Sequence, residues 1–332
     1  MKKVNFSVGY QPNDILKRTA LANRGGVAEI YFPCPGLPSG RGVPEFYSPE
    51  KAAEDLAEYA GAGFRLNMLF NGNCYGAAAQ SRELFNKIGD EIDAACEKFG
   101  LSSITTASPL IAKFAAKNFP SLEIRASVNM EISTPDAMAY LAENFGAFYA
   151  KREFNYDFAK LSAMRRWCES NGKKLYILAN SGCLDFCPAR TFHDNLVAHQ
   201  HEISKMDNAF AFHGLCREFL SNPDARGDFL RRTNFIRPED IHLYAGLCDG
   251  VKLATRTARN PAAIVAAYCA GKFGGNLLDL TEPSHAGHFY PSVLENSRIP
   301  DSYAKTRMNC AKNCAECGYC REVQKSAAVI LK

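Results

Sequence analysis

The sequence predicts an α/β protein built on a closed (β/α)8 barrel of the TIM type, distorted by one long insertion. Short runs of β-branched and apolar residues alternate with amphipathic stretches of helical length, and eight such runs are present. No GxGxxG motif follows the first run, so nothing indicates an open dinucleotide-binding sheet. The chain has 332 residues, 47% of them hydrophobic, which is enough for a barrel core with additions.

The elements follow from their local patterns. Ser48-Pro49, Ser108-Pro109 and Thr134-Pro135 each resemble a helix start, with a hydroxyl N-cap and proline at the first helical position. The expected strands are 4–8, 29–32, 65–69, 103–106, 123–127, 147–150, 174–178 and 251–254. The expected helices are 14–23, 48–60, 81–99, those opening at 108 and 133, 157–170 and 261–270.

Two further segments lie outside the repeats. We expect a barrel domain over 1–275 that carries an insertion at 180–249, and a cysteine-rich extension over 276–332 that metal rather than a hydrophobic core organises. The start of the chain lacks a signal-like apolar run, and no window approaches the roughly 18 apolar residues of a membrane span. We therefore expect a cytoplasmic protein with no membrane insertion. The net charge of +4 is only mildly basic and does not require a nucleic-acid partner, so we expect none.

Thirteen cysteines set this sequence apart, since closely spaced cytosolic cysteines more often bind metal or do redox chemistry than form disulfides. In CAKNCAECGYC, Cys310, Cys314, Cys317 and Cys320 stand close enough to hold one centre. The Cys-x2-Cys-x2-Cys spacing favours an iron–sulfur cluster, with zinc as the alternative metal. The competing interpretation is a reduced, solvent-facing tail without metal.

A second cysteine group is expected at the barrel mouth. Cys183 and Cys187 follow the seventh strand, and Cys216 lies in the insertion after it. This is the end of the barrel where active sites form, because they lie at the carboxyl ends of the strands. Cys34 follows the second strand and is the candidate fourth ligand, in competition with Cys74. One or two [4Fe–4S] clusters are thus expected. Alternatively, these are buried structural cysteines, a common state for free cysteine.

Four motifs resemble the U32 peptidase-like family over roughly residues 1–285: FYAKREFNYD, ANSGCLDFCPAR, NFIRPEDIHLY and VKLATR. The resemblance implies a barrel-like fold and, in several branches, a cysteine-held [4Fe–4S] cluster. Those branches include oxygen-independent hydroxylation proteins acting on ubiquinone or RNA bases, whereas the peptidase name comes from collagenase-like members. The cysteine spacing and the tail differ from the ubiquinone proteins, which leaves the substrate open.

The motifs also supply the candidate catalytic residues, Arg152, Glu153, Lys252 and Arg256. These follow or lie on strands near the expected barrel mouth, where they would bind an anionic or oxygen-rich substrate. The alternative is an internal ion-pair lattice within the barrel.

Three classes of function remain open. The first is an iron–sulfur enzyme for oxygen-independent hydroxylation, or a related redox modification, of a small molecule or biosynthetic intermediate. The second is a non-catalytic iron–sulfur scaffold or redox subunit, with a protein partner of the same family. The third is a U32-type protease, although the sequence has no HExxH or GxSxG motif, and His193, His199 and His201 have no settled zinc-binding spacing.

Overall fold

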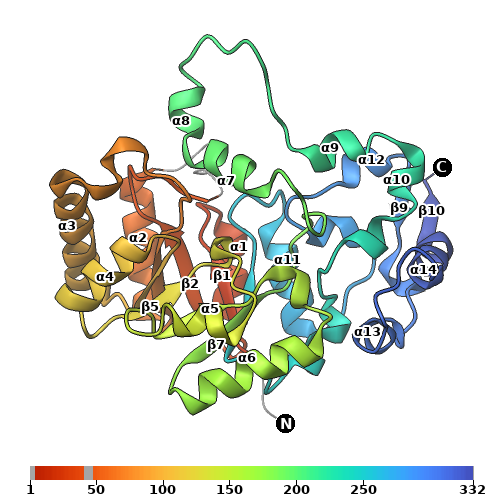
Figure 1. Ribbon diagram of the computed structural model, residues 1–332, viewed down its shortest axis with the longest axis horizontal. Coiled ribbons are helices and arrows are strands. Elements are labelled where there is room, and N and C mark those ends of the chain that lie inside the picture. Colours follow the sequence, from red (N-terminus) through yellow and green to blue (C-terminus); the bar gives the residue numbers. More distant parts are fainter. Residues whose placement is uncertain (1–3, 41–47, 332) are drawn as a thin grey trace.

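Eight parallel strands close into a barrel in chain order, with β1 paired to both β2 and β8 (Figure 1). The structure is a computed structural model that describes residues 4–40 and 48–331. The strands are β1 (Phe6–Gly9), β2 (Val27–Pro33), β3 (Arg65–Phe70), β4 (Ser103–Thr106), β5 (Glu123–Ala126), β6 (Ala147–Tyr149), β7 (Lys174–Leu178) and β8 (Gly250–Leu253). The expected (β/α)8 class is therefore confirmed, with strand bounds that differ by at most two residues from those expected.

The helices expected between the strands cover the outside of the barrel. Ser48 and Ser108 accept hydrogen bonds from the backbone amides of Lys51 and Ile111, as their N-cap positions require. These helices are α1 (Asp14–Ala22), α2 (Pro49–Gly61), α3 (Arg82–Phe99), α4 (Pro109–Asn118), α5 (Pro135–Ala139), α6 (Phe158–Ser170) and α11 (Pro261–Ala270). None of the helices in the part of the chain that the structure describes is both long and apolar enough to cross a membrane.

Short helical segments occupy the loops that follow the strands. The turns η1 (Gly76–Gln80), η2 (Val128–Met130) and η3 (Arg152–Phe154) come after β3, β5 and β6. The insertion after β7 crosses one end of the barrel, and a long excursion joins α8 to α9 (Figure 1). It contains α7 (Arg190–Ala198), α8 (Gln200–Ile203), α9 (Leu215–Phe219), α10 (Pro223–Arg226), η4 (Phe229–Arg232) and η5 (Pro238–Tyr244).

The tail packs against the barrel rather than standing apart from it. It contains η6 (Leu277–Leu280), α12 (Ala286–Phe289), β9 (Ser292–Leu294), η7 (Asn296–Arg298), α13 (Tyr303–Met308), α14 (Tyr319–Ala327) and β10 (Ala328–Ile330), with β9 and β10 antiparallel. Leu278, Leu294, Tyr303 and Val323 are buried in the same hydrophobic cluster as the barrel strands. The expectation that metal organises the whole tail is therefore wrong, because its scattered apolar residues converge on one core. The longest stretch of the tail without a buried residue is 308–322, which holds all four cysteines.

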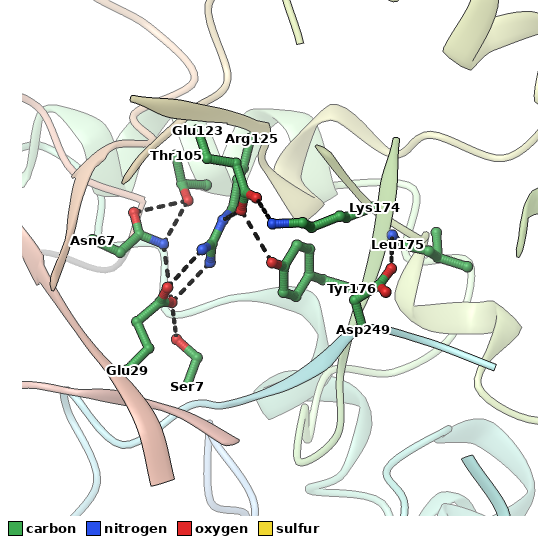
Figure 2. Close-up of polar contacts among 10 residues, drawn as sticks. All are labelled: Ser7, Glu29, Asn67, Thr105, Glu123, Arg125, Lys174, Leu175, Tyr176 and Asp249. Atoms are coloured by element: carbon green, nitrogen blue, oxygen red, sulfur yellow. Dashed lines mark hydrogen bonds and ion pairs between the residues drawn. The ribbon is translucent and has the colours of Figure 1, made fainter. Parts of the chain in front are cut away.

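A charged pair lies inside the barrel (Figure 2). Arg125 of β5 donates through Nη1 and Nη2 to the two carboxylate oxygens of Glu29 of β2, at 2.8 and 2.6 Å, and both side chains are 1% exposed. Ser7 and Asn67 donate to the same carboxylate. Burial is the largest single effect and opposes ionisation of Glu29, but the charge and hydrogen bonds of Arg125, together with the hydrogen bond from Ser7, hold the pKa of Glu29 below its ordinary value. The interior thus contains an ion-pair lattice, built from residues other than the candidate catalytic ones.

Removing one partner of this pair should destabilise the fold. We expect Arg125→Met to lower the free energy of unfolding by about 3–5 kcal/mol, because Glu29 would remain buried and uncompensated. The measurement is urea denaturation followed by circular dichroism. The matched variant is the double replacement Glu29→Met with Arg125→Met, which should lose less than the single one. A double variant as unstable as the single would contradict the uncompensated-charge explanation.

Candidate functional site

A small cavity lies at the carboxyl ends of the strands. Its volume is about 40 Å³, and Tyr31, Asn71 and Asn129 contribute polar groups to its wall. Four charged side chains also line it: Arg152, Lys252, Arg256 and Glu282. Three of the four candidate catalytic residues therefore share one cavity at the barrel end where active sites of this fold form.

Lys252 is the titratable centre of this cavity. It stands on β8 with 8% of its surface exposed, and its Nζ lies 4.0 Å from the centroid of the Tyr31 ring and 5.6 Å from that of Tyr149. Burial, reinforced by the charge of Arg256, lowers the pKa of Lys252 to about 7. Near neutral pH the amine can therefore either attract an anion or accept a proton.

Arg152 connects the cavity to a cysteine. Its Nη1 donates to Cys183 Sγ at 3.5 Å and its Nη2 donates to Asn129 Oδ1 at 3.1 Å. The side chain is 5% exposed, and its buried Nε has no hydrogen-bond partner among the described residues. A buried donor without an acceptor is costly, so it indicates a place for a bound group.

Glu153 contacts the loop that contains the cysteines rather than the barrel-mouth cavity. Its Oε1 accepts hydrogen bonds from Arg190 Nη2 at 2.7 Å and from the backbone amide of Phe186 at 3.3 Å. Since Phe186 stands between Cys183 and Cys187 in the chain, Glu153 holds the cysteine loop in position. Glu153 is thus not among the described residues that line the barrel-mouth cavity with the other three candidates, and its contacts are with the cysteine loop and Arg190.

The structure brings Cys183, Cys187 and Cys216 together. Burial raises the pKa of the Cys216 thiol, and the thiols of Cys183 and Cys187 raise it further, which reflects their proximity. His193 joins them. A Cβ placed on Gly214 would lie 3.5 Å from Cys216 Sγ and 3.2 Å from His193 Cε1, so both side chains border the same glycine. We name Cys183, Cys187 and Cys216 the barrel cysteine group.

Cys34 lies apart from this group. Its side chain is 1% exposed and donates weakly to the carbonyl of Pro35, at 3.8 Å. Burial raises the pKa of its thiol, with Glu91 and Lys87 of α3 as the charged neighbours. The structure therefore does not support Cys34 as the fourth ligand. Side chains alternate along β2, and because Tyr31 faces the cavity, the side chain three residues later points outward.

The four tail cysteines line a separate cavity of about 210 Å³, whose wall also includes Arg307 and Tyr319. Burial raises the pKa of the Cys320 thiol; Arg307 opposes this shift, and the other three thiols add to it. We name Cys310, Cys314, Cys317 and Cys320 the tail cysteine group. Across residues 4–40 and 48–331, no set of three or more His, Cys, Asp or Glu side chains is arranged to hold a metal ion. The thiols in both groups are gathered but do not converge on a point.

Two important residues were missed from the sequence. Glu282 reaches the barrel-mouth cavity because its backbone pairs with the loop after β7: its amide donates to Asn180 at 2.9 Å and its carbonyl accepts from Gly182 at 3.0 Å. Arg307 forms a wall of the tail cavity. No spacing rule connects either residue to its cavity, since both arrive through tertiary packing of the tail.

These features define a (β/α)8 barrel protein with cysteines at its mouth and a second cysteine group in its tail. No known family model matches the chain. It is 27% identical over 304 residues to an uncharacterized protease of Methanocaldococcus jannaschii, covering 86% of this chain and 87% of the relative. Its fold is similar to that of the U32 peptidase Mk0906, with a TM-score of 0.57 and 14% identity over 76% of this chain and 92% of that one. The resemblance to the U32 peptidase-like family is confirmed by these comparisons.

Proposed function

We propose that this protein is an iron–sulfur enzyme that carries out an oxygen-independent hydroxylation, or a related redox modification, of a small anionic or oxygen-rich molecule. One observation carries the proposal: Arg152 lines the barrel-mouth cavity and also donates to Cys183 of the barrel cysteine group. A centre held by these thiols would therefore lie beside the substrate.

The donor set of the barrel group suits an iron–sulfur cluster. Thiolates are the usual ligands of such clusters, and the three thiols of the barrel group lie near one another. One iron would remain for another donor, and the imidazole of His193 borders Cys216. Histidine replaces cysteine at some iron–sulfur centres, so His193 is our candidate in place of Cys34.

The tail group also suits a cluster better than a single ion. Zinc needs four ligands that converge at about 2.0–2.3 Å. The tail thiols line a cavity of about 210 Å³, and their Cys-x2-Cys-x2-Cys spacing is common at iron–sulfur sites. This supports a multi-atom group, and zinc remains the alternative that metal analysis would reveal.

Each residue of the barrel mouth then has a role. A cluster would supply one-electron chemistry beside the cavity. Arg152 and Arg256 would bind the anionic oxygens of the substrate, since guanidinium groups match such oxygens well. Lys252, whose pKa of about 7 leaves it part neutral, would hold or accept the proton released during oxidation of the substrate. Glu282 would partly balance the positive charge of these three side chains.

The test is metal and sulfide analysis after anaerobic purification. We expect iron and acid-labile sulfide, with visible charge-transfer absorbance, in the wild-type protein. Serine at Cys183, Cys187 and Cys216 should remove the barrel centre while the tail centre stays. The matched control is Cys96→Ser, at a half-buried cysteine of α3 outside both groups.

Other outcomes would favour other functions. The relative from Methanocaldococcus jannaschii is named a protease, so peptide cleavage by a cluster-free protein would replace the redox proposal with hydrolysis. Clusters without turnover of any substrate until a second protein is added would favour a redox subunit. Absence of both iron and sulfide from anaerobic preparations would refute the iron–sulfur proposal.

A further inference from the structure

One short stretch of chain, residues 232–234, is hydrogen-bonded both to the loop of the barrel cysteine group and to Arg307, which lines the tail cavity. We propose that the tail cysteine group holds an electron-entry centre, and that this stretch together with Arg307 carries electrons from it to the barrel cysteine group. This inference rests on the proposed function, since it needs a cluster at each group.

Arg307 forms the tail side of the connection. It lines the cavity of the tail cysteine group and is 6% exposed. Its Nη1 donates to the carbonyl oxygen of Thr233 at 2.7 Å, and its Nη2 donates to Asn234 Oδ1 at 2.8 Å. A single buried side chain thus contacts both the tail cavity and the 232–234 stretch.

The barrel side of the connection uses the same stretch. The backbone amide of Asp185, a residue between Cys183 and Cys187, donates to the carbonyl oxygen of Arg232 at 2.7 Å. Asn234 Nδ2 donates to the carbonyl oxygen of Glu153 at 3.0 Å. The side chain of Glu153 also accepts from the amide of Phe186, so hydrogen bonds and the covalent bonds of Glu153 connect Arg307 to the loop that holds Cys183 and Cys187.

The surroundings of Arg307 keep this path dry and fixed. The guanidinium carbon lies 4.2 Å from the ring centroid of Tyr156 and 5.7 Å from that of Tyr303, and both rings are buried. Lys312, between two tail cysteines, donates to the carbonyl oxygens of Tyr156 and Arg307 at 3.1 and 3.0 Å. The cysteine segment is therefore hydrogen-bonded directly to the loop between β6 and α6, which also contains Arg152.

Exposure gives the path a direction. Two of the four tail cysteines, Cys310 and Cys317, are exposed, whereas all three cysteines of the barrel group are half-buried within the insertion. A one-electron carrier protein, of the ferredoxin or flavodoxin class, can approach the tail group. The tail cysteines would hold a centre that accepts one electron from the reduced carrier, and Arg307 with residues 232–234 would connect that centre to the barrel cysteine group. No bond is formed or broken in this step, and the carrier is the reductant.

Two measurements test the proposal. Electron paramagnetic resonance of the fully reduced wild-type protein should show spin–spin broadening. The sum of the spectra of two variants that each keep one centre should lack this broadening. Those variants carry serine at the barrel group or at the tail group. In stopped flow, flavodoxin hydroquinone should reduce the barrel centre at least tenfold more slowly when the tail cysteines are serine.

The connection itself is tested by Arg307→Lys, which keeps the charge but loses the two-point contact with Thr233 and Asn234. We expect an intermediate rate with full iron content, whereas Lys305→Ala, at an exposed residue of α13, should leave the rate unchanged. Additive spectra and equal rates, with both centres loaded, would overturn the relay while leaving the proposed function intact. Zinc in the tail would overturn it too. Absence of iron from the anaerobically purified wild-type protein would instead refute the proposed function.

Discussion

Serine in place of Cys310, Cys314, Cys317 and Cys320 should remove about half of the iron, because two cubane clusters contain equal amounts of it. The variant should keep the barrel fold, since α13 and α14 are anchored by apolar packing on either side of the cysteine segment. Without a centre, residues 309–318 have little to bury, so we also expect this segment to become sensitive to proteases. Iron analysis and limited proteolysis measure the two effects.

Substitution separates the possible results better than truncation would. A chain cut before Asn309 would also lose α14, whose Gln324 accepts from the amide of Leu230 and whose Arg321 pairs with Asp228. Unchanged iron and zinc in the serine variant would rule out a tail centre. Complete loss of iron would indicate a single shared cluster.

Lys252→Met should stabilise the protein at pH 6, and the gain should shrink as the pH rises. In the unfolded chain Lys252 keeps its proton up to about its ordinary pKa of 10.5, whereas in the folded protein it releases the proton near 7. Between these values the unfolded state binds more protons, so raising the pH favours the folded state. The shift corresponds to about 4–5 kcal/mol as an upper limit.

The measurement is urea denaturation of both proteins at several pH values between 6 and 10, because comparison with the variant cancels other titrating groups. Lys113→Met, on the exposed side of α4, controls for the general effect of removing a lysine. A stability difference that does not change with pH would show that Lys252 is not held in a desolvated site. Loss of anion binding above pH 7 in the wild-type protein would provide independent support.

The barrel was predictable because its signals are local. Parallel strands are buried on both faces and read as short apolar runs, and hydroxyl–proline pairs mark the helix starts. The candidate residues Arg152, Lys252 and Arg256 came to one cavity because each follows or lies on a strand that ends at the mouth. The tail cysteine group was proposed from its spacing, and the barrel cysteine group from its place after the seventh strand and in the insertion.

The remaining features depend on tertiary packing. Cys34 lies apart from the barrel cysteine group because strand alternation points its side chain toward the charged neighbours of α3 rather than into the cavity that Tyr31 lines. Glu282 and Arg307 belong to the tail, and their positions depend on how the tail returns to the barrel. The apolar residues of the tail are too scattered to resemble a helix or strand face, although they complete the common core.

Pairing between the first and last barrel strands has a consequence for synthesis of the chain. Phe6 of β1 pairs with Val251 of β8, so the barrel cannot close until most of the chain has left the ribosome. Until then, β1 presents an unpaired edge that can add a strand from another nascent chain. The loop containing Cys183 and Cys187 emerges well before that closure, while Cys310 to Cys320 emerge after it. Thiols of the first group are therefore exposed to oxidation for longer than those of the second, which makes expression without oxygen and at low temperature the condition of choice for recovering intact protein.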